Sequence, residues 1–573
     1  MAELNVDIDA RCRSAVSLSG ARVDTFRIAA IVSALSLLHT GFVFGIENNL
    51  FHLPIVAGLY DEPQYRDDAF IQSLRYFASG VWLLLGNAEK HFGDVQALFL
   101  VLDYLSRLLS FVGFLCCASL VGVVERRDKV IFALVVCFIS FLDGDSHAGA
   151  GGLFLRYFTH SEIANGTVLL AIYFAAKGRF TAATLALGVT FFTNVFIAVW
   201  LAPLLLAIAV VLLAKQETDI ATICVRVSAG IVLCIPFAWP VIHSVVSNPE
   251  FGSPIDFDFA TFLRQYYPVH VLISSIPASD IVALAGVAAI GAVALWRLGP
   301  RAAELRVAYV GVMFVYAVGI VLPHMTGSPL LLNLHLLRSS TIIHLLAGLA
   351  AAALVVNWFR AESVTSFLLA ALLLLTLSLH GVALWLAIPI MLIPVVLPAA
   401  QDSAPAYLRT IGYVVLAVVV LIVWPYSFWQ NFTFNSMFAD AVAEWRDVGE
   451  WARRSTSPTA VFLVPPRPRD DAILPSNAPD IALSRTAVFE FTSHRRVFVD
   501  FKRGAAVMWM PSYYPVWRSR MIETERLGSL AERIEYASRH GIAYVVDRCE
   551  PTANDGVIFR TRRLCVIPAG RQM

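Results

Sequence analysis

The chain has 573 residues, of which 58% are hydrophobic and only 15% are charged, and its mean hydropathy is +0.70. Soluble domains contain about 45–50% apolar residues, so this composition predicts a protein that crosses a membrane many times. The formal net charge of +1 argues against nucleic-acid binding, which needs a clustered basic face. The sequence contains no Gly-rich phosphate loop, paired CxxC or HExxH pattern, so nothing indicates nucleotide hydrolysis or structural zinc.

Apolar spans dominate the chain after a polar start. Residues 1–24 are polar, and the apolar stretch after them has no small-residue cleavage pattern, so we expect a cytoplasmic tail followed by an uncleaved anchor. The sequence predicts about thirteen spans, each able to cross a hydrocarbon layer about 30 Å thick. The spans lie near residues 25–45, 95–124, 129–142, 161–176, 180–196, 198–214, 227–246, 279–296, 307–323, 340–357, 364–380, 382–398 and 411–429.

The basic residues between these spans predict the topology. With thirteen crossings, every basic cluster between spans falls on the cytoplasmic side, as the positive-inside rule requires. The count depends on residues 180–214, which we interpret as two short helices that turn near Asn194. The segments that then face outward are 46–94, 143–160, 247–278, 324–339 and everything after Phe428.

The first outer segment, 46–94, is the most acidic part of the chain. Its carboxylates are Glu47, Asp61, Glu62, Asp67 and Asp68. A low-dielectric boundary favours the neutral form of a carboxyl group, which moves its pKa toward the range of a general base. Glycosyl transfer to a hydroxyl needs one such base, and the leaving phosphate needs cationic stabilisation. The alternative is a solvated loop whose acids only face water.

Aromatic residues run through the same segment. Tyr65 lies among the acids, and the stretch 70–85 keeps Gln72, Arg75 and Ser79 on one polar side. This pattern is typical of a segment that lies along the membrane surface. An enzyme that uses a lipid-linked substrate needs such a platform, although an inert amphipathic helix has the same pattern.

The second outer segment, 143–160, carries alternating acidic and imidazole side chains. Asp143, Asp145 and His147 could bind a divalent cation, and Arg156 and His160 follow them. The spacing indicates no fourth ligand, so the sequence assigns no metal site and no cofactor.

The fourth outer segment ends in a histidine and an arginine at the mouth of an apolar span. An ionisable residue at this depth is costly and suggests function. The planar guanidinium of Arg338 fits a phosphate group in two-point contact, so Arg338 is a candidate ligand for a lipid phosphate. The alternatives are a topology anchor for Arg338 and packing roles for His335 and His344.

The tail, residues 436–573, returns to a soluble composition and has the size of one domain. Its pattern predicts a small α/β domain. We expect helices near 440–454 and 527–539, and strands near 460–464, 488–491, 496–500, 543–546 and 565–567. Cys549 and Cys565 form a disulfide if the tail lies in an oxidising compartment, and are otherwise two buried thiols.

This layout resembles the GT-C superfamily of integral-membrane glycosyltransferases. The resemblance is carried by the first span, the acidic outer loop with LYDEPQYRDDAF, the many short spans and a tail containing WARRSTSPTAVFLVPP and FEFTSHRRVFVDFK. It implies a polyprenyl-phosphate-linked sugar donor and inverting transfer. It also implies a catalytic acid in the first outer loop, which by position is Asp61 or the pair Asp67 and Asp68. A base close behind the first span would instead be Glu47, and Arg338 matches the later phosphate-binding arginine.

We therefore expect a mostly α, polytopic transmembrane bundle with a small extracytoplasmic α/β domain, in a bacterial inner membrane. Its expected reaction transfers sugar from a polyprenyl-phosphate donor to a glycan, lipid or protein acceptor. Asp68 or Asp67 would be the base, assisted by Asp61, and Arg75 and Tyr65 would line the acceptor groove. The other substrate-binding candidates are His335, His147 and His160.

Three other functions remain open at this point. A transporter or flippase would show paired halves, which are not visible here. A non-catalytic subunit of a polysaccharide assembly machine would not need the outer acids. An O-antigen polymerase or ligase would rely on arginines in its outer loops.

Overall fold

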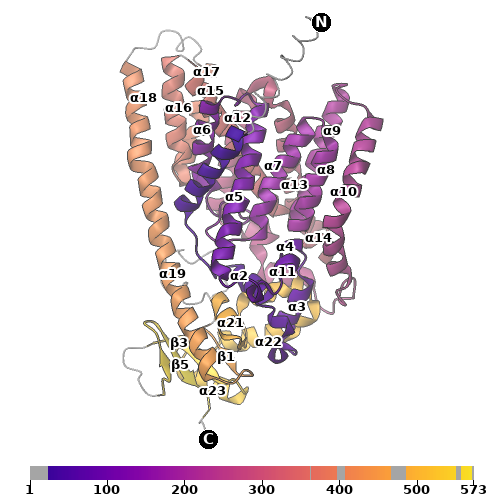
Figure 1. Ribbon diagram of the computed structural model, residues 1–573, viewed down its shortest axis with the longest axis vertical. Helices are drawn as coiled ribbons and strands as arrows, with labels where there is room; N and C mark the ends of the chain where they lie inside the picture. Colours follow the sequence, from indigo (N-terminus) through magenta and orange to yellow (C-terminus); the bar gives the residue numbers. More distant parts are fainter. Residues whose placement is uncertain (1–22, 362, 397–406, 466–485, 550–555, 571–573) are drawn as a thin grey trace, which may run out of the picture.

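The computed structural model describes residues 23–361, 363–396, 407–465, 486–549 and 556–570 (Figure 1). Within these residues, a helix lies in each of the thirteen expected spans, whereas residues 1–22 of the expected cytoplasmic tail and 397–398 of the twelfth span lie outside the described residues. Eight helical stretches are long and apolar enough to cross a membrane, and three shorter apolar helices accompany them. The helices are the first helix (Val23–Thr40), α5 (Val95–Leu120), α6 (Arg126–Cys137), α7 (His160–Ala176), α8 (Phe180–Thr193), α9 (Val195–Ala214), α10 (Ile220–Val246), α12 (Ala278–Arg297), α13 (Ala303–Met325), α15 (Ser340–Arg360), α16 (Val364–Leu377), α17 (Ala387–Val396) and α18 (Tyr407–Val418) with α19 (Trp424–Ser455).

The turn that decides the topology is present at Asn194. Its backbone is extended, and its side-chain oxygen accepts hydrogen bonds from the amides of Phe196 and Ile197. Such an N-cap satisfies amides that the first turn of a helix leaves free. Two antiparallel helices, α8 and α9, therefore replace one long helix.

The segments predicted to face outward gather at one end of the bundle, together with the C-terminal sheet (Figure 1). The first of them is not one lying helix, because Phe77 and Ser79 have extended backbone and break the run 70–85 into short pieces. The short elements at this end are α2 (Asn49–Ala57), η1 (Leu59–Asp61), η2 (Pro63–Tyr65), α3 (Ala69–Ser73), η3 (Leu74–Tyr76), α4 (Gly80–Leu85), η4 (Ala88–Lys90), α11 (Phe259–Tyr266), α14 (Pro329–Leu332) and η9 (Leu336–Ser339).

The tail forms a small α/β unit around a five-stranded sheet of order β2-β1-β3-β5-β4. Strand β1 pairs parallel with β2 and β3, and β5 pairs antiparallel with β3 and β4. Its elements are β1 (Val461–Leu463), α21 (Ala487–Ser493), β2 (Arg496–Val497), η13 (Phe501–Met508), η14 (Pro511–Tyr513), α22 (Tyr514–Glu525), α23 (Leu530–Arg539), β3 (Tyr544–Arg548), β4 (Phe559–Arg560) and β5 (Leu564–Pro568).

One predicted strand of the tail is wrong. The sequence favours a strand near 488–491 because two phenylalanines flank Glu490, but the structure has helix α21 there. The helix packs between α19 and α2, and this tertiary contact buries Val488 and Phe489 completely. Tertiary packing of this kind overrides intrinsic strand preference. The expected fold class, a polytopic helical bundle with a small C-terminal α/β unit, is confirmed.

The tail and the outer segments share one hydrophobic core. A single cluster of buried residues runs from the first outer segment, through Phe158 and Phe262, to Trp445, Trp517 and Val566. Helix α18 continues through a π-helical turn (Val419–Val423) into α19, which carries the chain out of the bundle to the sheet. The tail is therefore joined to the bundle by a continuous helix and by a common core.

A disulfide joins Cys549 and Cys565, which lie at the ends of the β3–β5 pair. The bridge closes a loop with a sequence separation of 16 residues. Disulfides persist in oxidising compartments and are rare in the cytosol of mesophiles.

We predict that alkylation of the denatured protein without reductant leaves two fewer thiols modified than alkylation after reduction, as measured by intact mass. Replacing both residues, Cys549→Ser with Cys565→Ser, should lower the free energy of unfolding of the tail by about 3 kcal/mol, the value expected for a loop of about 15 residues. Equal thiol counts in the two alkylations would show that the bridge is absent from the protein.

Candidate active site

Two carboxylates and three cationic side chains converge at the outer end of the bundle. The Asp145 carboxylate interacts electrostatically with Glu47 and with the cationic groups of Arg156, Arg338 and Lys502. These residues come from the first, second and fourth outer segments and from the tail. Opposite charges collected from four distant parts of one chain are typical of a site that binds or transforms an ionic ligand.

Asp145 is open to water although protein surrounds it on all sides. Desolvation, and next to it the neighbouring Glu47 carboxylate, raise the pKa of Asp145 to about 6, although Arg338, Lys502 and Arg156 act in the opposite direction. A carboxylate with this pKa is ionised at neutral pH and basic enough to accept a proton.

Charged side chains inside the bundle fix the position of the second outer segment, which carries Asp145. The fully buried Arg107 guanidinium of α5 donates to the carbonyl of Leu155, and the Glu162 carboxylate of α7 accepts from the amide of the same residue at 2.6 Å. Arg107 also binds Asp103 at 3.5 Å and the carbonyl of Ser36 at 3.1 Å. Both backbone groups of Leu155 are thus held by charged partners, which sets the position of the next residue, Arg156.

The backbone around the site adopts conformations that side chains rarely take. Seven non-glycine residues among those described have positive φ, and four of them lie here: Glu47 (49°), Ala148 (49°), Ala150 (51°) and His335 (47°). Each costs of order 1 kcal/mol and persists only where the surrounding structure imposes it. Here the carbonyls of Ala148 and Ala150 accept from Tyr316 and from Arg338, at 2.7 and 3.0 Å.

Arg338 lines a small cavity between the outer ends of α9 and α15. The cavity has a volume of about 20 Å³, which is enough for about one water molecule. His335 also lines it, and burial, aided by the Arg338 charge, lowers the His335 pKa to about 3, so the imidazole stays neutral. The Nε of Arg338 and the Nδ1 of His335 are buried without a hydrogen-bond partner among the described residues. Two residues that line this cavity therefore carry polar atoms without a protein partner in the described parts of the chain.

The tail supplies one of the cations. Lys502, in η13, donates to the Glu47 carboxylate at 2.7 Å. The chain from η13 to η14 lies over the outer end of the bundle, where Trp509 donates to the carbonyl of Ser73 and Asn333 donates to the carbonyl of Met508. The tail is therefore part of the site and not an appendage.

The three aspartates of the first outer segment lie away from this charged cluster, and two of them contact other residues. Asp61 forms an exposed ion pair with Arg75 at 2.9 Å. Asp68 caps α3 by accepting from the amide of Ile71, and lies 3.9 Å from the buried Arg503. Asp67 is exposed. The groups that act on the charge of Arg338 are Asp145 and Tyr157, so the structure does not bring these three aspartates to Arg338.

The remaining sequence-predicted residues divide between the site and its surroundings. Tyr65 is fully buried beside Glu490 and Asp68, so it does not line an open groove. His160 accepts from Trp82 at 2.9 Å, and its ring is close enough to Arg338 for their charges to interact. His147 instead contacts Asp280 at 3.3 Å.

The three residues that could bind a cation in the second outer segment, Asp143, Asp145 and His147, each contact different groups in the structure. Asp143 accepts from Asn431 at 3.1 Å, His147 contacts Asp280, and Asp145 faces the cationic cluster. In the parts of the chain that the structure describes, no three His, Cys, Asp or Glu side chains are grouped as they would be around a metal ion.

From the sequence, Asp145 and Arg156 have no assigned role in sugar transfer, and Asp103, Arg107 and Lys502 are not identified at all. Asp103 and Arg107 stand four residues apart inside an apolar span, a spacing that places them on one helix face and could have identified them. Lys502 gives no such signal, because its partner Glu47 lies 455 residues earlier.

Comparisons with known proteins add two similarities. A family model described as a domain of unknown function (DUF6798) matches residues 443–524, a range that includes Lys502. No curated protein matches the sequence. Among solved structures, the crystal structure of ArnT from Cupriavidus metallidurans bound to undecaprenyl phosphate is similar, with a TM-score of 0.42 and 14% identity over 97% of this chain and 99% of that chain.

We predict that Arg107→Met destabilises the protein by about 3–5 kcal/mol, because it leaves the buried Asp103 and Glu162 without their cation. The measurement is the thermal unfolding temperature in detergent micelles. Arg226→Met is the control, since Arg226 is exposed on α10 and loses only its hydrogen bond to the carbonyl of Gly178, so it should change stability by about 1 kcal/mol or less. Equal unfolding temperatures for the two variants would contradict the role given to Arg107.

Proposed function

We propose that the protein transfers a sugar from a polyprenyl-phosphate-linked donor to an acceptor on the outer side of a bacterial inner membrane. The observation that carries the proposal is the convergence of Asp145 and Glu47 with Arg156, Arg338 and Lys502 at one end of a membrane bundle. Such a transfer needs a base for the acceptor hydroxyl and cations for the departing phosphate, and this cluster contains both.

In the proposed reaction, Asp145 accepts the proton of the acceptor hydroxyl as its oxygen attacks the anomeric carbon. The bond between sugar and phosphate breaks, and polyprenyl phosphate leaves with the electron pair. Arg338 and Arg156 stabilise the charge that develops on the phosphate, since guanidinium groups bind phosphate oxygens in two-point contacts. Lys502 adds a third cation and holds Glu47 beside Asp145.

The disulfide supports the proposed side of the membrane. The tail that contains Cys549 and Cys565 lies at the same end of the bundle as the charged cluster. An oxidising compartment favours this bridge, which supports an extracytoplasmic position for the tail and the site. Lipid-linked sugars presented on that side would meet the site from the membrane.

The proposal is tested by a transfer assay. Membranes with and without the protein receive radiolabelled polyprenyl-phosphate sugars, and consumption of the labelled lipid supports transfer. Uptake into vesicles without consumption would support a transporter or flippase instead. Neither result in a correctly folded protein would support a non-catalytic assembly subunit.

We predict that Asp145→Asn lowers the rate of transfer by about 10²–10⁴-fold, the usual contribution of a general base. The rate is measured at saturating donor, and insertion is checked by the unfolding temperature of the purified variant. Asp67→Asn is the control because Asp67 is an exposed carboxylate of an outer segment away from Arg338, and it should retain full activity. If Asp68→Asn lost most of its transfer activity while Asp145→Asn stayed active, the general base would instead lie in the first outer segment.

The raised pKa of Asp145 also predicts the pH dependence of transfer. The carboxylate must be ionised to accept a proton, so activity is full above a pH of about 6 and falls as pH decreases through that value. The measurement is the pH profile of kcat/KM for the wild type and for Asp145→Asn. The fall in activity at acidic pH should be seen in the wild type and be absent from the residual activity of the variant. An acidic limb near pH 4, the ordinary aspartate range, would contradict this assignment.

A further inference from the structure

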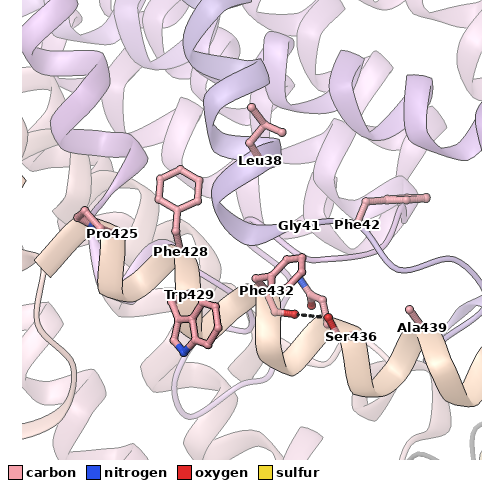
Figure 2. Close-up of a pocket in the computed structure, with 10 residues that line it drawn as sticks. Leu38, Gly41, Phe42, Pro425, Phe428, Trp429, Phe432, Ser436 and Ala439 are labelled. Atoms are coloured by element: carbon pink, nitrogen blue, oxygen red, sulfur yellow. Dashed lines mark hydrogen bonds between the residues drawn. The ribbon is translucent and has the colours of Figure 1, made fainter. Parts of the chain in front are cut away.

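A groove with largely apolar walls lies beside the site, between the outer end of the first helix and the first half of α19 (Figure 2). Leu38 and Phe42 form one wall, and Phe428, Trp429 and Phe432 form the other. Its volume of about 520 Å³ is within the range of about 300–1,000 Å³ that small-molecule sites occupy. The groove is therefore large enough for part of a chain-like ligand.

Hydrogen bonds at the inner side of the groove connect it to the charged cluster of the site. Asn431 and Asn435 of α19 lie four residues apart on one helix face, and they donate to the carbonyls of His39 and Thr40 at 3.0 and 2.7 Å. The Oδ1 of Asn435 accepts from Arg156 at 3.3 Å. Asn435 thus lines the groove and also touches a cation that interacts with Asp145.

A glycine keeps this connection tight. Gly41 lines the groove with φ of +73°, and a Cβ there would lie 2.0 Å from the amide nitrogen of Asn435. No other residue type fits at this position without moving Asn435. The close approach brings the end of the first helix and the amide of Asn435 together at the point where the groove meets Arg156.

The aqueous end of the bundle is covered by the tail. The segment from η13 to η14 is bound by Asn248, which donates to the carbonyl of Trp509 at 2.7 Å, and by Glu250, which accepts from the amide of Ser512 at 2.8 Å. Together with its bonds to Ser73 and Asn333, this segment lies on three of the four outer segments. A ligand with a long apolar chain therefore reaches the site more readily from the side than through this cover.

We infer that the groove holds the isoprenoid chain of the polyprenyl phosphate, with the phosphate directed toward Arg156. This inference rests on the proposed function and adds the place where the lipid lies. The aromatic and aliphatic walls match an apolar chain, and the guanidinium at the inner end matches an anionic head group. The continuity of the groove with the site distinguishes this position from the rest of the lipid-facing surface.

The test uses the full chain in nanodiscs and a polyprenyl phosphate that carries a photoreactive group in its isoprenoid chain. After irradiation, peptide mass spectrometry maps the labelled residues, which should fall in 38–42 and 425–439. Ser436→Trp fills the groove and should reduce this labelling about tenfold. Thr433→Trp is a matched control, because both hydroxyls bond to the carbonyl four residues earlier, at 2.8 Å for Ser436 and 2.9 Å for Thr433, and only Ser436 lines the groove.

Three results would overturn the inference. The first is labelling confined to other helices, and the second is equal labelling of the wild type and Ser436→Trp. The third is equal labelling of the groove by a photoreactive phosphatidylglycerol that excess polyprenyl phosphate does not displace, because the groove would then hold bulk lipid. Sugar transfer is measured on the same samples. Sugar transfer without labelling of the groove would exclude only the groove as the lipid site. Labelling of the groove without sugar transfer would exclude the proposed function but still support a lipid site in the groove.

Discussion

The outer end of this molecule depends on an arginine buried in the middle of a membrane helix. Arg107 is balanced by Asp103 and holds the carbonyl of Leu155, while Glu162 holds the amide of the same residue. A charge at such depth is expensive in a bilayer and survives only with partners on several helices. Here the partners come from α5, from α7 and from the end of the first helix, so the charges that fix the second outer segment also fix three helices to one another.

A second buried charge group joins the tail to the first outer segment. Arg503 binds Glu490 within the tail, stacks over the ring of Phe70 at 4.7 Å and lies 3.9 Å from Asp68. Asp68 thereby has a structural explanation, since it caps a helix and faces a buried guanidinium. The first charge group fixes the second outer segment and the second fixes the tail, and these two parts supply Asp145 and Lys502 to the same charged cluster.

Much of this architecture follows from local sequence patterns, and the site does not. The spans and the turn at Asn194 can be predicted because hydropathy and capping act over a few residues. The density of acids near Asp68 points to the wrong part of the outer surface for contact with Arg338, because helix capping uses that carboxylate locally. The pairing of Glu47 with Lys502 joins the two ends of the chain, and no periodicity within either segment encodes it.

Helix α19 has a mechanical consequence. It leaves the bundle without a break and ends shortly before the first strand of the sheet, so the direction of this helix sets where the sheet lies. A transmembrane helix changes its tilt when the hydrocarbon layer becomes thinner or thicker. Because the tail and the outer segments share one buried core, a change in the tilt of α19 would act directly on the contacts between the tail and the bundle.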